Sequence, residues 1–185
     1  MSGKIAQMAF TIAIMSCLIF LYAPLYATAH SVEEGLELGF GAGLDIEDLG
    51  THPSFIMIRS SSEPEETPNW IRGLEGHFMV IDSEETTYLG SIVPFIRYIW
   101  AERRDWKPFG EIGLGAGLSN HDEINGRQMG GKFMFTITAS LGAELMSDSL
   151  GLVTISTRFI HYSNGGLYPF NQSYNAQFMV VSFLI

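Results

Sequence analysis

A histidine and a serine stand two positions apart in this chain, and this spacing could support nucleophilic catalysis. His161 and Ser163 belong to residues 158–171, which read R-F-I-H-Y-S-N-G-G-L-Y-P-F-N. In a β-strand, residues i and i+2 point to the same face with α-carbons about 6.5–7 Å apart, so the imidazole could reach the hydroxyl. A base within reach of a serine is the arrangement that activates a serine nucleophile. Because such tripeptides also occur by chance, the surrounding strand must show whether the pair faces a substrate.

The alternation of residue types around the pair predicts that it lies on an apolar face. One face of the stretch carries Val153, Ile155, Phe159, His161 and Ser163. The other face carries Thr154, Ser156, Arg158, Ile160 and Tyr162. Polar groups that face hydrocarbon cost free energy and tend to be functional. The position of the pair therefore suits a substrate that is itself a lipid.

The elements that must position this pair are predicted by a recurring pattern. Alternating apolar segments are separated by clusters of glycine, asparagine, aspartate, proline and other polar residues. The segments are 35–46, 53–61, 69–82, 87–101, 107–119, 131–146, 150–164 and 173–185. An even number of antiparallel strands can close without edges. The sequence therefore predicts an all-β fold, an eight-stranded antiparallel transmembrane β-barrel.

Charged and small residues occupy the face that this alternation turns inward. The charged ones are Glu37, Glu75, Glu111, Glu144, Arg97 and Arg158. We expect these groups to satisfy one another and to fill the lumen, so that the barrel is plugged. A soluble lipocalin-like barrel is the structural alternative, but it would need an apolar interior for its ligand and a polar exterior.

The N-terminal residues 1–29 are predicted to be a signal peptide. Lys4 precedes an apolar stretch, and Ala27-Thr28-Ala29 forms a small-x-small cleavage site. The apolar run 8–25 is also long enough for an uncleaved membrane anchor, which is the alternative. Residues 30–185 then form a single barrel domain. Cys17 is the only cysteine, so a cleaved product could form no disulfide.

The charge balance and the spacing of the histidines exclude other functions. The chain has 10 lysine and arginine residues against 20 aspartate and glutamate residues, so it lacks the basic surface that nucleic acid requires. His30, His52, His77 and His121 show no metal-ligand spacing with one another. We therefore expect no nucleic-acid partner, no metal and no cofactor.

The C-terminal part of the chain resembles the PagL-type lipid A 3-O-deacylases, whose motif is approximately H-x-S-N-A-G. His161, Ser163, Asn164 and Gly166 match this motif in register, and Asn171 lies in the turn that follows. A weaker resemblance begins at Pro108-Phe109. The resemblance implies a serine esterase of the Gram-negative outer membrane, which removes the acyl chain ester-linked at the 3-position of lipid A in lipopolysaccharide.

The resemblance also implies a role for each matched residue. Ser163 would be the nucleophile and His161 its general base, while the Asn164 side chain and the Gly166 N–H would stabilise the oxyanion. Lipid A would be the partner, and the mechanism needs neither metal nor cofactor. The oligomeric state is left open, a homodimer included.

Two positions depart from the family pattern. The glutamate that would complete the triad falls at Asn175, which can orient an imidazole but contributes less electrostatically. Gly165 replaces the usual alanine, which we expect to be a mild change. Two alternatives follow, namely a non-catalytic small barrel with a role in adhesion or membrane integrity, and a relative that binds lipid A without turnover.

Overall fold

A computed structural model of the chain describes residues 35–47, 51–64, 66–67, 69–83, 85–101, 106–147 and 150–185. The predicted signal peptide, residues 1–29, lies outside these residues. Within the described ranges, no helix is long and apolar enough to cross a membrane.

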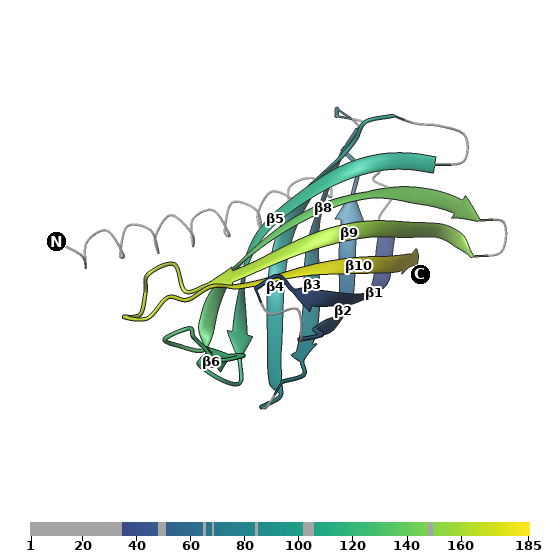
Figure 1. Ribbon diagram of the computed structural model, residues 1–185. Coiled ribbons are helices and arrows are strands. Elements are labelled where there is room, and N and C mark those ends of the chain that lie inside the picture. The colour runs from purple at the N-terminus through teal and green to yellow at the C-terminus, as the bar shows by residue number, and fades with distance from the viewer. Residues whose placement is uncertain are drawn as a thin grey trace.

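Eight antiparallel strands close into a barrel. Figure 1 shows how these strands are arranged. They are β1 (Gly35–Asp45), β2 (Ser54–Ser62), β3 (Trp70–Ile81), β4 (Thr87–Ile99), β5 (Trp106–Ser119), β8 (Phe133–Ser147), β9 (Gly151–Ser163) and β10 (Tyr174–Leu184). Strand β1 pairs with β10, so the first and last strands close the ring. The predicted eight-stranded fold is confirmed, and the predicted strand ends lie within two residues of the observed ones. A small hairpin of β6 (Glu123–Ile124) and β7 (Arg127–Gln128) stands in the loop between β5 and β8 and was not predicted.

The outer face of the barrel is apolar, as the alternation predicts. Ile112 and Leu141, in the middle of β5 and β8, expose 59% and 58% of their surfaces. Leu118, near the end of β5, exposes 63%. A soluble protein would not leave so many large apolar side chains in water, so this exterior favours a lipid environment over the lipocalin-like alternative.

One half of the lumen holds a network of buried charges. Its members are the six predicted residues Glu37, Glu75, Arg97, Glu111, Glu144 and Arg158, together with Arg59. Arg158 meets Glu75 through two hydrogen bonds of 2.8 Å. Arg97 donates to Glu111 over 3.0 Å and to Glu144 over 2.6 Å. Each guanidinium therefore finds a carboxylate, which offsets the desolvation of both groups.

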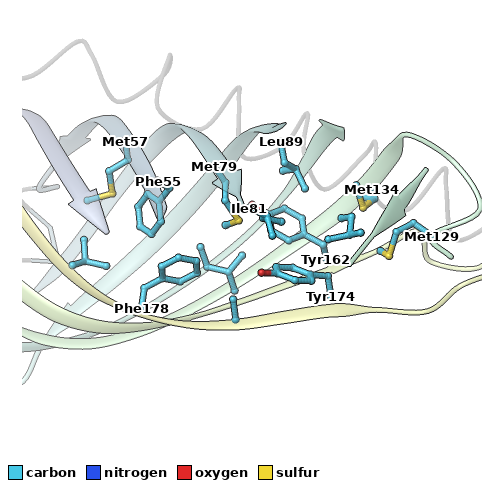
Figure 2. Close-up of a cluster of buried hydrophobic side chains, with 14 residues drawn as sticks. Phe55, Met57, Met79, Ile81, Leu89, Met129, Met134, Tyr162, Tyr174 and Phe178 are labelled. Atoms are coloured by element: carbon cyan, nitrogen blue, oxygen red, sulfur yellow. The ribbon is translucent and has the colours of Figure 1, made fainter. Parts of the chain in front are cut away.

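The other half of the lumen is mainly apolar, which corrects the expectation of a small and charged interior. The cluster consists of Phe55, Met57, Met79, Ile81, Leu89, Ile124, Met129, Met134, Ile160, Tyr162, Tyr174, Ala176, Phe178 and Val180. Figure 2 shows labelled members of this cluster pointing toward one another inside the ring of strands. Because part of the interior is apolar, the interior does not argue against a soluble lipocalin-like barrel. The apolar exterior is the observation that does.

Candidate active site

Three loops meet at one end of the barrel, which we call the loop end, where β9 ends and β10 begins. They are residues 46–53, 120–132 and 164–173, and only parts of the first are described. Figure 1 shows the β6–β7 hairpin beside the loop that precedes β10. The backbone and side chain of Gln172 hydrogen-bond to the backbone of Gln128 over 3.2 and 2.6 Å. The loop between β9 and β10 is thus held by the neighbouring loop that carries the hairpin.

His161 and Asn175 face each other on the outer surface. The two residues are direct partners across β9 and β10, so their side chains leave the sheet on the same side. The Nδ1 atom of His161 lies 2.7 Å from Oδ1 of Asn175. Because Oδ1 can only accept, Nδ1 carries the proton and Nε2 is left with a lone pair. This tautomer is the one that a general base requires.

Ser163 is the last residue of β9 and shares the outer face with His161. Both side chains are half-buried, so each is open on one side. Within the described chain, no hydrogen bond joins Ser163 to His161. Apo sites often show such loose geometry, and the spacing of two residues along a strand keeps the pair within reach. Phe135 stands opposite Ser163 on β8 and forms one wall of the site.

Both of the predicted oxyanion donors already make hydrogen bonds within the protein. The amide of Asn164 is fully buried and donates to the backbone carbonyls of Met129 and Phe170. The Gly166 N–H donates to Asn164 Oδ1 over 2.7 Å, which forms an Asx turn. In this conformation Asn164 therefore holds the two loops together, and neither donor is free to meet an oxyanion.

Asn171, which follows the motif in the turn, stabilises the same loop. Its Oδ1 accepts the backbone N–H of Asn164 over 3.0 Å. The turn is therefore closed from both sides of Asn164.

Gly165 is a more demanding position than the sequence indicates. Its φ is +62°, and a Cβ placed there would lie 2.8 Å from the ring of Phe135. An alanine would be strained both by the backbone conformation and by this contact. The expectation of a mild change is therefore wrong for this structure, because glycine allows the turn to pass close to the wall of the site.

An apolar groove runs over the outer face below the histidine. It has a volume of about 580 Å³, and its lining includes Thr157 and Phe159 of β9 and Ala139 and Leu141 of β8. Phe159 lies two residues before His161 on the same face, so the groove begins next to the site. Its shape and polarity suit a hydrocarbon chain.

The loops supply two residues that the sequence analysis missed. Asn175 Nδ2 donates to Glu47 Oε1 over 2.8 Å, and Glu47 Oε2 lies 3.1 Å from Nε of Arg127. Neither residue belongs to a motif or to an alternating segment. Nothing in the local sequence therefore signals that they approach His161.

The inward side of the same strand carries a second unpredicted contact. Tyr162, between His161 and Ser163, points into the lumen, where its hydroxyl lies 2.6 Å from Nε2 of His77. Alternation placed Tyr162 inside but gave no partner for it.

Among the described residues, no group of three or more histidine, cysteine, aspartate or glutamate side chains could hold a metal ion. The groups at this site are a hydroxyl, an imidazole and amides, which are suited to nucleophilic acyl transfer.

Comparison with known proteins supports this chemistry. The sequence matches the family described as lipid A 3-O-deacylase (PagL) over residues 59–183. The fold resembles the crystal structure of the outer membrane enzyme PagL with a TM-score of 0.70 and 18% identity, over 80% of this chain and 99% of that one. Neisserial surface protein A is similar with a TM-score of 0.53 and 9% identity, over 84% of this chain and 100% of that one. No curated protein sequence matches the chain.

Proposed function

Since the chain belongs to the lipid A 3-O-deacylase (PagL) family, outer-membrane β-barrel enzymes that hydrolyse an ester, we propose that Ser163 and His161 carry out this reaction. The observation that carries the proposal is the bond from His161 Nδ1 to Asn175 Oδ1. It fixes the imidazole on the outer face with Nε2 as its basic nitrogen.

The reaction follows from these positions. Ser163 Oγ attacks the carbonyl carbon of the 3-linked acyl ester while His161 Nε2 takes the hydroxyl proton. The tetrahedral intermediate collapses, the bond to the sugar oxygen breaks, and His161 returns the proton to that oxygen. Water then attacks the acyl carbon of the acyl-serine while His161 Nε2 takes a proton from it. The bond from the acyl carbon to Ser163 Oγ breaks, His161 returns the proton to Oγ, and the free fatty acid leaves. Asn175 orients the imidazole and stays neutral throughout.

The oxyanion site forms in a rearranged loop. The Gly166 N–H becomes available when its bond to Asn164 Oδ1 opens, which costs a single hydrogen bond at an exposed residue. The Asn164 amide would have to leave two backbone carbonyls in a buried position, which costs more. Gly166 is therefore the primary donor, and Asn164 contributes only when the loop opens further.

The groove beside Phe159 and Leu141 receives the acyl chain. Its lining is almost entirely apolar, and it lies on the lipid-facing side of the barrel. A lipid substrate therefore keeps its hydrocarbon in an apolar environment while the ester reaches Ser163. This arrangement accounts for a hydrolytic site on the outside of a barrel whose lumen is filled.

Mass spectrometry of lipid A tests the proposal. Lipid A from a Gram-negative host that expresses the native chain should lack one ester-linked hydroxyacyl group. Lipid A from a host that expresses the Ser163→Ala variant should be intact. Heat-modifiable migration of both proteins is the control for folding, because the substitution removes a hydroxyl and no packing group. Equal deacylation by the two proteins would overturn the assignment of Ser163. Unchanged lipid A with a folded native barrel would favour the relative that binds lipid A without turnover.

A further inference from the structure

The orientation of the Asn175 amide is selected by one neighbour. Asn175 Nδ2 lies 2.8 Å from Glu47 Oε1 and 3.3 Å from Ser173 Oγ. A carboxylate only accepts hydrogen bonds, so the edge of the amide that faces Glu47 must be the NH₂ group. A serine hydroxyl can donate or accept and therefore selects neither orientation. We propose that Glu47 is a positioning residue that turns the carbonyl of Asn175 toward His161.

This orientation matters because an asparagine can present either of two faces to an imidazole. With the carbonyl toward His161, Nδ1 keeps its proton and Nε2 is the base. With the NH₂ group toward His161, Nδ1 must accept and the proton moves to Nε2, where it prevents proton abstraction from the nucleophile. A carboxylate at position 175 would accept in either orientation. Because position 175 is an asparagine and not a carboxylate, the orientation of its amide must be fixed, and Glu47 fixes it.

Glu47 is itself held in place by a charged neighbour. Its Oε2 lies 3.1 Å from Nε of Arg127, whose terminal nitrogens bind Asp45 over 2.8 and 3.1 Å. Burial alone would lower the pKa of Arg127, but the hydrogen bond to Asp45 and the charges of Asp45 and Glu47 raise it, so the guanidinium stays charged. Each oxygen of Glu47 therefore has one donor, Asn175 on one side and Arg127 on the other.

This division predicts an unusual order of mutational effects. A glutamine at position 47 has only one oxygen for two donors, and charged Arg127 competes for it more strongly than a neutral amide. The glutamine NH₂ group then faces Asn175 and turns its carbonyl away from His161. An alanine at position 47 imposes no orientation. Glu47→Gln should therefore impair catalysis more than Glu47→Ala, although glutamine is the closer substitute.

The inference rests on the proposed function, and kinetics of the full-length protein in detergent micelles with lipid A test both. Glu47→Gln should lower kcat about tenfold, the worth of roughly one hydrogen bond, and Glu47→Ala about two- to threefold. In an Asn175→Asp background, Glu47→Gln should cause no loss, because the carboxylate at 175 accepts from both neighbours. Glu85→Gln, which changes an exposed acid on another loop of the loop end, should leave kcat unchanged.

The ¹⁵N shifts of the His161 imidazole give a readout that a general loop defect would not move. They should report a proton on Nδ1 in the native protein and on Nε2 in Glu47→Gln, with His161→Ala identifying the resonances. The inference is overturned if Glu47→Gln retains native kcat and the native tautomer, or if it loses the same factor in both backgrounds. Activity that survives Ser163→Ala would instead overturn the proposed catalytic site, whatever Glu47 does.

Discussion

Two series of polar side chains, which we call the inner chain and the outer chain, reach strand β9 from opposite sides of the barrel wall. The inner chain runs through Arg158, Glu75, His77 and Tyr162. The outer chain runs through Arg127, Glu47, Asn175 and His161. Both begin with a guanidinium on a carboxylate and end on neighbouring residues of the same strand. They differ in enclosure, because the inner chain is buried throughout whereas the outer chain is open to its surroundings.

Enclosure separates the structural network from the proposed catalytic one. Inside the lumen, a group that loses its partner cannot recruit water freely, so the loss of a contact lowers the free energy of unfolding. On the outer face, the groups can be rearranged at small cost, and a substrate can reach them. The difference predicts that substitutions in the inner chain reduce stability, whereas substitutions in the outer chain reduce activity.

The largest effect is expected at the end of the outer chain. The His161→Ala variant should lower kcat by about 10⁴-fold or more, since it removes the proposed general base, without which little of the chemical rate remains. Its free energy of unfolding should remain near the native value because His161 is half-buried. Deacylation kinetics together with urea unfolding in detergent measure both quantities. A loss of stability in place of activity would place His161 in the structural network.

The Glu75→Ala variant should show the opposite behaviour. It removes the carboxylate that Arg59, Arg158 and His77 all contact. The buried Arg158 loses the carboxylate of its ion pair, while Arg59 keeps its contacts with Glu111 and Glu37. We expect the free energy of unfolding to fall by about 3–5 kcal/mol. Urea unfolding and heat-modifiable migration measure this loss. A native-like stability would mean that the remaining carboxylates of the lumen compensate.

The Tyr162→Phe variant should have an intermediate effect on stability. The substitution keeps the ring in the apolar cluster but removes the hydroxyl that lies 2.6 Å from His77. An unpaired buried group costs about 1–3 kcal/mol. Because Tyr162 points away from the outer face, kcat at a temperature well below the unfolding transition should change less than twofold. A large loss of kcat would show that the inner chain also positions the catalytic strand.

The smallest effect is expected from Asn175→Asp, and it should be a gain. A carboxylate would stabilise the imidazolium that forms when His161 takes the proton, while the nearby charge of Glu47 partly opposes it. We expect kcat to rise about three- to tenfold, an increase of about 1 kcal/mol in transition-state stabilisation. Steady-state deacylation measures the change. A fall in kcat would indicate that the neutral amide is part of an optimised site.

Much of the fold and part of the site are local properties of the sequence. Alternation along each strand decides which side chains face out, so the apolar exterior and the inward glutamates were predictable. The same periodicity puts His161 and Ser163 on one face. The motif around Ser163 also pointed to the family that the comparison shows.

The tertiary structure alone decided the contacts between segments that are distant in the chain. The register of eight strands divides the lumen into an apolar half and a charged half, which no single strand reveals. Loop packing brings Glu47 to Asn175 and Arg127 to Glu47, and it uses the Asn164 amide to join two loops. These contacts depend on turn geometry and on ring closure. Periodicity carries no information about either, because it describes the direction of a side chain and not the partner that it meets.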